Sequence, residues 1–157
     1  MKKIMMVFLA ILFVINLFSF TGNEIVGKWL TENGKSIIKI EKIDDSFQGK
    51  IIWLKEPIYP KDDKNAGKEK MDIHNPDKNK RTNKLVGLKL LWGFHFKKDK
   101  WIGGKIYDPE SGKTYFCKIQ MDKSGNLKIK GSIDKWGMIG RSTVWKKVSE
   151  ENERGNK

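Results

Sequence analysis

The sequence predicts a single-domain, all-β fold, an antiparallel up-and-down β-barrel of about eight strands. Short segments of alternating apolar and polar residues recur along the chain, as expected of strands with one face on a core and the other in water. Turn-forming residues separate most of these segments, and no segment of useful length has the periodicity of a helix. Closing the sheet into a barrel removes its unpaired edges, and a β-sandwich is the structural alternative.

The clearest element is a hairpin over residues 100–121. Two aromatic-rich runs flank a turn at residues 108–112, whose proline and final glycine suit a type I turn and its exit. In the second run Lys118 and Gln120 alternate with Tyr115, Cys117 and Ile119, which predicts that the latter three share the buried face. Cys117 is the only cysteine, so it can form no intrachain disulfide, and we expect it to be buried and unreactive.

The remaining strands show the same alternation between turns. Asn33-Gly34 is a strong two-residue hairpin signal between the first two strands. Trp92, Phe94 and Phe96 alternate with smaller or polar residues and are expected on one face. Strands are expected over residues 25–31, 36–43, 47–54, 85–96, 101–107, 113–121, 127–133 and 138–148.

A polar, Lys-rich segment over residues 55–84 interrupts the strand pattern, and a loop of this length is usually functional or disordered. The Asn-Pro-Asp sequence at 75–77 combines an N-cap residue, a first-turn proline and a first-turn acid, which predicts one or two helical turns over 76–81. We expect residues 72–81 to be ordered, as a lid or a contact for a partner, and residues 61–70 to be mobile. The candidate interaction residues of this loop are Asp72, Asn75, Asp77 and Arg81.

The first residues have the pattern of a secretory signal peptide: two lysines followed by an apolar run over residues 4–20. We expect a cleaved signal peptide over 1–22, a barrel domain over 23–148 and a disordered tail over 149–157. The protein is then periplasmic or secreted. An uncleaved membrane anchor is the alternative, because the run is near the lower length limit for a membrane span.

The formal net charge of +13 comes almost entirely from lysine, because only Arg81, Arg141 and Arg154 of the 32 basic residues are arginines. Planar recognition of bases and phosphates favours arginine, so nucleic acid is not an expected partner. Weak contact with anionic surfaces of the cell envelope is compatible with this charge.

Two residues carry a resemblance to the lipocalin-type barrel: Trp29, within a Gly-x-Trp motif that begins at Gly27, and Arg141, on the expected last strand. The resemblance implies that the Arg141 side chain lies over the Trp29 ring and closes one end of the barrel. Stacking of a guanidinium on an indole is physically favourable, by about 0.5–2 kcal/mol.

The chain is also similar to the bacterial domain of unknown function 2147 (DUF2147) family, exported proteins expected to form a lipocalin-like barrel. This resemblance implies a fold and a compartment but no activity. Its motifs are Gly27-x-Trp29, Asp72-x-x-Asn75-Pro76-Asp77, Leu85-x-Gly87, Trp101-x-Gly103-Gly104-x-Ile106-Tyr107-Asp108-Pro109, Gly112-x-x-Tyr115, Gly131, and Gly140-Arg141 with Trp145.

No arrangement of residues in the sequence indicates catalysis, which needs a nucleophile with a base, paired carboxylates or a metal. His74 lies between Asp72 and Asp77, but their spacing matches no established set of metal ligands. The sequence therefore indicates no catalytic residue, metal or cofactor, and the protein is expected not to be an enzyme.

The expected function is the binding or carriage of a small apolar or amphipathic ligand in the cell envelope, because an eight-stranded barrel can hold one small ligand. The alternative is an envelope protein-interaction module with a solid barrel core, and an enzyme of unrecognised type comes third. A continuous void of about 300 Å³ or more would favour a ligand. The candidate ligand-binding residues are Trp53, Phe94, Tyr115 and Ile119, with Trp136 near the mouth of the barrel.

Overall fold

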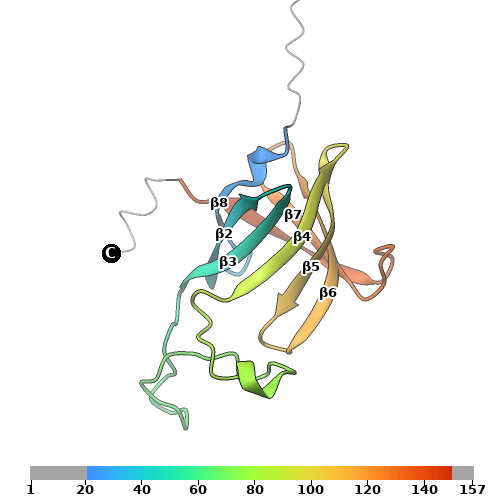
Figure 1. Ribbon diagram of the computed structural model, residues 1–157. Coiled ribbons are helices and arrows are strands. Elements are labelled where there is room, and N and C mark those ends of the chain that lie inside the picture. The colour runs from blue at the N-terminus through green and yellow to red at the C-terminus, as the bar shows by residue number, and fades with distance from the viewer. Residues whose placement is uncertain (1–20, 150–157) are drawn as a thin grey trace, which may run out of the picture.

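The computed structural model describes residues 21–149 and contains a closed, antiparallel, eight-stranded barrel in which each strand pairs with its neighbours in sequence (Figure 1). The last strand closes the barrel on the first through the pairs Trp29↔Lys147 and Leu30↔Lys146. The strands are β1 (Gly27–Leu30), β2 (Ser36–Ile43), β3 (Ser46–Leu54), β4 (Lys89–Lys97), β5 (Lys100–Asp108), β6 (Lys113–Met121), β7 (Leu127–Ser132) and β8 (Gly140–Lys147).

The predicted barrel is confirmed, and the alternative of a β-sandwich is excluded. The expected bounds of β2 and β6 agree with the structure, because turn-forming residues follow each strand directly. The predicted signal peptide and C-terminal tail lie outside the described residues, except at residues 21, 22 and 149. Among residues 21–149 we find no helix with the length and apolar character needed to span a bilayer.

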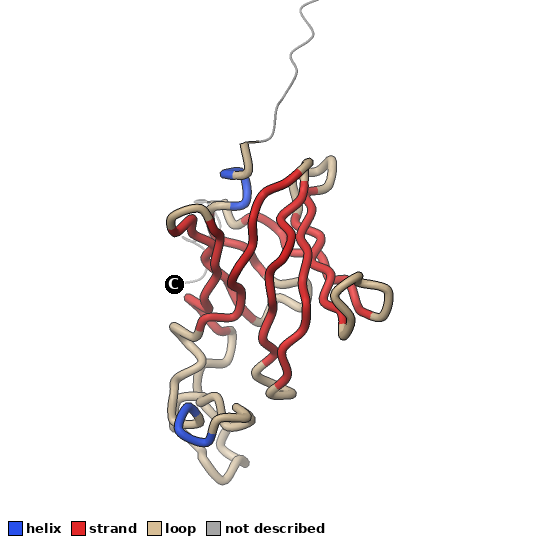
Figure 2. The backbone as a smooth tube through the Cα atoms, turned by 45° about the vertical axis from the view of Figure 1, so that its right-hand side comes forward, coloured by secondary structure: helices blue, strands red, loops and turns tan. Residues whose placement is uncertain are grey.

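One end of the barrel is sealed by tryptophans and by the segment that precedes β1. A 3₁₀ turn, η1 (Asn23–Ile25), lies across this end in both views (Figure 2). The Trp29 indole donates a hydrogen bond of 2.8 Å to the Ile25 carbonyl, and the Trp101 indole donates one of 2.9 Å to the Gly22 carbonyl. Both indoles are fully buried, and these hydrogen bonds satisfy their N–H groups, which water cannot reach.

Two inward glycines allow close packing toward this sealed end. A Cβ atom at Gly104 would lie 2.5 Å from atoms of the Phe94 ring, and one at Gly49 would lie 3.0 Å from a methyl group of Leu91. At each position a large neighbouring side chain therefore occupies the space that the glycine leaves inside the barrel. This half of the barrel is solid.

The prediction that Trp92 shares a face with Phe94 and Phe96 was wrong. Leu91 and Phe94 are both buried although they lie three residues apart, so the two-residue alternation breaks between them. The break falls at Gly93, which has φ 75°, a conformation open to glycine. Trp92 is consequently half-buried and lies opposite Lys105 in the ladder.

The opposite end of the barrel carries the long loop of residues 55–84, as Figure 2 shows. Two isolated bridges, Ile58↔Glu69 and Met71↔Lys84, organise this loop. Asp72 fastens it to the barrel: its fully buried carboxylate accepts hydrogen bonds of 2.6 Å from the Tyr107 hydroxyl and 2.6 Å from the Asn75 amide.

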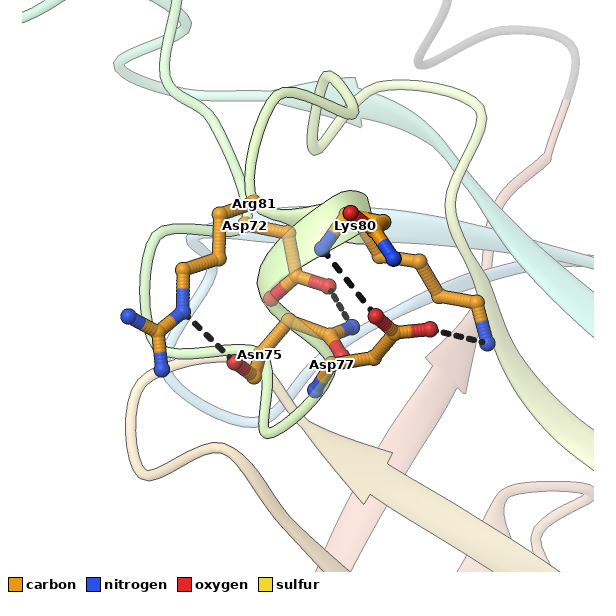
Figure 3. A network of polar contacts seen from close by, with 6 residues as sticks. Asp72, Asn75, Asp77, Lys80 and Arg81 are labelled. Carbon is orange, nitrogen blue, oxygen red and sulfur yellow. Dashed lines mark hydrogen bonds and ion pairs between the residues drawn. The ribbon is translucent and has the colours of Figure 1, made fainter.

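The predicted helical turns after residue 75 are reduced to one 3₁₀ turn, η2 (Lys78–Lys80), whose N-cap is Asp77 and not Asn75. The Asp77 carboxylate accepts from the Asn79 amide at 3.0 Å, while the Asn75 side chain accepts from the Asp77 amide at 2.9 Å. The Arg81 guanidinium donates to the Asn75 carbonyl at 2.8 Å, which closes the network (Figure 3). Two successive Asx turns therefore replace the single expected cap.

Residues 61–70, expected to be mobile, form a small closed loop held by backbone hydrogen bonds. The Gly67 amide donates to the Tyr59 carbonyl at 3.1 Å, and the Lys70 amide donates to the Pro57 carbonyl at 2.8 Å. Their mobility stays a prediction.

The prediction that Arg141 stacks on Trp29 was wrong. The side chain over the Trp29 ring is Lys147, whose Nζ lies 5.6 Å from the ring centroid. Arg141 pairs with Gly131 near the start of β8. At about 3.3 Å per residue, the six positions between Arg141 and Lys147 separate their backbones by about 20 Å, so Arg141 lies toward the open end of the barrel.

Candidate functional site: an open cavity in the barrel

A cavity of about 730 Å³ occupies the open half of the barrel, between the inner faces of β5, β6, β7 and β8. Its wall is largely apolar, with polar groups near the mouth. The apolar lining residues are Ile106, Ile129, Ile133 and Ile139, and the polar ones include Asp108, Tyr115, Arg141 and Thr143. This volume lies in the range of about 300–1,000 Å³ that is typical of small-molecule sites.

Gly131 on β7 explains why this half is hollow. It faces inward, opposite the buried Cys117, and a Cβ atom there would lie 3.5 Å from Ile106 and 3.8 Å from Tyr115, at ordinary contact distances. No large side chain fills the space that its missing side chain leaves, in contrast to Phe94 beside Gly104. The cavity is therefore a consequence of small residues at this level of the barrel.

Arg141 belongs to the inward-facing row of β8. The pairs Leu127↔Trp145 and Gly131↔Arg141 belong to one ladder, and Trp145 is buried in the core. Alternation therefore places Thr143 and Arg141 on the same inner face, progressively nearer the open end. Arg141 is solvent-exposed there, and within residues 21–149 its guanidinium forms no ion pair or hydrogen bond. A cation thus lies uncompensated at the mouth of an apolar cavity.

Two carboxylates near the mouth, those of Asp108 and Glu32, accept hydrogen bonds from local partners. The Asp108 carboxylate accepts hydrogen bonds from the Glu110 amide at 3.0 Å and from the Ser111 hydroxyl at 2.6 Å. The Glu32 carboxylate, in the turn between β1 and β2, accepts from the Thr143 hydroxyl at 2.9 Å. Neither forms an ion pair with Arg141, so its positive charge remains available to a ligand.

Of the five residues expected to bind a ligand, Tyr115 lines the cavity. Phe94 and Ile119 are wrong as lining residues, because both are buried in the solid half of the barrel. Trp53 is half-buried on β3 and does not line the cavity, and Trp136 is exposed in the connection between β7 and β8.

The sequence reasoning missed the isoleucine wall of the cavity and assigned Arg141 to the other end of the barrel. One signal could have found the site. In the run Lys128-Ile129-Lys130-Gly131, glycine stands where the alternation calls for another large apolar residue. A glycine in that position leaves space inside the barrel.

The expected contact residues of the long loop divide into two groups. Asp72 is buried against Tyr107, so its carboxylate is a fastening inside the molecule and cannot contact a partner. Burial raises the pKa of the Tyr107 hydroxyl far above its usual value, and the hydrogen bond to the negative Asp72 raises it further. Asp77 and Arg81 are exposed and Asn75 is half-buried, and the role of these three as a contact surface stays a prediction.

Cys117 and the two histidines each lie in a defined local environment. Cys117 is buried, as predicted, and burial raises the pKa of its thiol to about 12. A ring nitrogen of His74 lies 3.3 Å from the Pro109 carbonyl oxygen, and one of His95 lies 3.1 Å from the Asp45 carbonyl oxygen. In the part of the chain that the structure describes, no group of three or more His, Cys, Asp or Glu residues is placed to hold a metal ion.

An eight-stranded barrel that is sealed at one end and hollow at the other is the architecture of a lipocalin-like protein. The chain belongs to the DUF2147 family, described as an uncharacterized protein conserved in bacteria, whose family model matches residues 27–147. A solved structure with a similar fold is protein HP1028 from Helicobacter pylori, which is described as belonging to the lipocalin family. It is 26% identical, with a TM-score of 0.70 over 83% of this chain and 87% of that chain. No curated protein matches the sequence.

Proposed function

We propose that the protein binds and carries a small amphipathic molecule with an apolar body and an acidic head group in the bacterial cell envelope. The observation that carries the proposal is the 730 Å³ cavity, with isoleucines along its wall and Arg141 at its mouth. The apolar body would lie against Ile106 and Ile129, and the head group would meet the guanidinium. Arginine suits this task because its fork of donors matches a carboxylate or phosphate.

We further propose that the protein is exported and acts by binding and not by catalysis. The basic start and apolar run of residues 4–20 support export. The raised pKa of the Cys117 thiol, about 12, keeps this potential nucleophile protonated at neutral pH. The Asp108 carboxylate in the cavity wall and the Glu32 carboxylate beside Thr143 accept hydrogen bonds from neighbouring groups.

Calorimetric titration with dodecanoate and with dodecanol tests the proposed ligand class. The two probes share an apolar chain and differ in head-group charge. We expect Arg141→Gln to weaken dodecanoate binding about tenfold and to leave dodecanol binding within about twofold, at the low end for a charged hydrogen bond because Arg141 is exposed. Gly131→Leu should abolish binding of both, because its side chain would enter the cavity.

Arg81→Gln is the matched control, since Arg81 is the other arginine in the described chain and lies in the long loop away from the cavity lining. Its dodecanoate affinity should equal that of the unchanged protein. The proposal fails if neither probe binds the unchanged protein. It also fails if the Arg141→Gln and Gly131→Leu proteins bind dodecanoate as well as the unchanged protein does.

A further inference from the structure

The connection between β7 and β8, residues Ile133 to Ile139 and here called the 133–139 loop, exposes an unusual set of side chains. Ile133, Trp136, Met138 and Ile139 are 66–83% exposed to solvent, although all four are large and apolar. In Figure 1 the loop projects from the barrel on the side away from the long loop, and Figure 2 agrees. Apolar residues clustered in this way on a surface mark an interaction site.

The loop is held open by its own backbone and by one carboxylate. Asp134 accepts hydrogen bonds from the amides of Met138 at 3.0 Å and Ile139 at 2.7 Å. These hydrogen bonds lower the pKa of the Asp134 carboxyl. The Ile133 amide donates to the Ile139 carbonyl at 3.0 Å and closes the base of the loop. The exposed apolar side chains therefore stand on a backbone that is ordered by hydrogen bonds within the loop itself.

Basic residues continue directly from the loop over the outer face of β6 and β7. Lys118 and Lys130 are paired across these strands, and they border a shallow hollow with Lys100 and Lys128; we call these four the basic strip. The strip reaches the loop, because a Cβ atom at Gly137 would lie 3.2 Å from the Lys118 Nζ. Strands β6, β7 and β8 contain no acidic residue.

We propose that the 133–139 loop inserts into the surface of an anionic phospholipid bilayer, with the basic strip on the head groups. Tryptophan favours the interface between head groups and acyl chains, and Met138 and the two isoleucines match the acyl region just below. The ammonium of Lys135 lies 4.9 Å from the centroid of the Trp136 ring and adds a cation at the same depth. A second copy of the chain is the poorer occupant, since its own basic strip would oppose this one.

Docking in this way would place the mouth of the cavity against the bilayer, because Ile133 and Ile139 belong both to the loop and to the cavity wall. An amphipathic molecule could then pass between the membrane and the barrel without crossing water. The docking surface itself does not depend on the proposed ligand, and the two proposals can fail separately.

Quenching of tryptophan fluorescence by brominated lipids tests the proposal in the full chain. Trp136 is the highly exposed tryptophan of residues 21–149, so quenching at the membrane should come mainly from it. Vesicles with about 30% brominated phosphatidylglycerol should quench the unchanged protein, and Trp136→Phe should remove most of that signal. Vesicles of brominated phosphatidylcholine alone should quench at least tenfold more weakly at equal lipid.

Charge and apolar variants separate the two parts of the surface. Lys118→Gln with Lys130→Gln should lower the apparent vesicle affinity about 30-fold, and Met138→Ser should lower it about tenfold. The matched controls lie in the long loop: Lys61→Gln with Lys64→Gln for the charge variant, and Ile58→Ser, which removes an exposed apolar side chain as Met138→Ser does. These controls should stay within about twofold of the unchanged protein.

Gly131→Leu fills the cavity and should dock normally, which distinguishes failed ligand binding from failed docking. Equal quenching by neutral and anionic vesicles, no quenching by either, or an equal loss in the long-loop controls would overturn the proposal. A dimer in sedimentation that dissociates in the Trp136→Ser protein, without vesicle binding, would overturn it in favour of self-association.

Discussion

The two halves of this barrel are built from the same alternating strands and differ in what stands beside their inward glycines. Toward the sealed end, Phe94 fills the space over Gly104 and Leu91 fills the space beside Gly49. Toward the open end, the space beside Gly131 remains a cavity. The comparison teaches that the pattern of alternation fixes the barrel, while the sizes of a few inward residues decide where it is solid.

The sealed half also carries most of the fully buried aromatic surface, so it should dominate stability. Trp101→Ala removes a completely buried indole and the hydrogen bond that holds the segment before β1, and it should lower the free energy of unfolding by about 3–5 kcal/mol. Tyr115→Ala, in the wall of the cavity, should cost less than about 2 kcal/mol because Tyr115 is only half-buried. Urea unfolding measures both values, and equal losses would contradict the division into a solid and a hollow half.

The hydrogen bond between Asp72 and Tyr107 joins the long loop to the barrel, and removing it tests whether this bond keeps the loop ordered. Tyr107→Phe removes the donor from a buried carboxylate and should cost about 1–3 kcal/mol, with faster hydrogen exchange at Asp72 and Asn83. Tyr59→Phe, a half-buried tyrosine in the same loop, is the matched control and should change stability by less than about 0.5 kcal/mol. Unchanged exchange in the Tyr107 variant would mean that the loop is ordered by other contacts.

Because of the same hydrogen bond, we expect the free energy of unfolding to depend on pH in the alkaline range. The pKa of Tyr107 is higher in the folded protein than in the unfolded chain, so the folded state retains the phenol proton that the unfolded state loses above about pH 10. The contribution of Tyr107 is therefore complete below that pH and declines as the pH rises above it. Tyr107→Phe should flatten this part of the stability curve, measured by urea unfolding between neutral and alkaline pH. An equally steep decline in the variant would assign the effect to other groups.

The smallest expected effects on stability come from the two basic residues at opposite ends of β8, Arg141 and Lys147. Lys147→Met removes the ammonium over the Trp29 ring and should cost about 0.5–1 kcal/mol, as for an exposed cation–π pair. Arg141→Met should change the free energy of unfolding by less than about 0.5 kcal/mol, because Arg141 forms no ion pair among the described residues. A larger loss for Arg141→Met, measured by urea unfolding, would mean that its role is structural.

The strands could be predicted from the sequence because their alternation is regular, but the interruptions of the ladder could not. Gly93 and Gly103 signal a possible bulge, yet only the paired strands show that both adopt positive φ and turn Trp92 to the other face. Arg141 and Lys147 share one face of β8, and alternation alone cannot tell which of them reaches Trp29. That choice depends on the register with β1.

The 133–139 loop shows a second reason why parts of the structure could not be predicted from the sequence. Apolar Ile133, Met138 and Ile139 fit the predicted strands over 127–133 and 138–148, but β7 ends at Ser132 and β8 begins at Gly140. Hydrogen bonds to the Asp134 carboxylate hold the intervening residues in a loop. The strand bounds predicted from the sequence therefore extended into a loop whose apolar side chains are exposed.

Methyl NMR of isoleucine-labelled protein, titrated with dodecanoate, tests the central claim most directly because it observes both halves of the barrel at once. We expect concentration-dependent shifts of the Ile106 and Ile129 methyl signals, which belong to the cavity wall, and unchanged signals from Ile38 and Ile51 in the solid half. Gly131→Leu should abolish the shifts. Unshifted Ile106 and Ile129 signals at saturating dodecanoate, or equal shifts in both halves, would contradict a ligand site in the open half of the barrel.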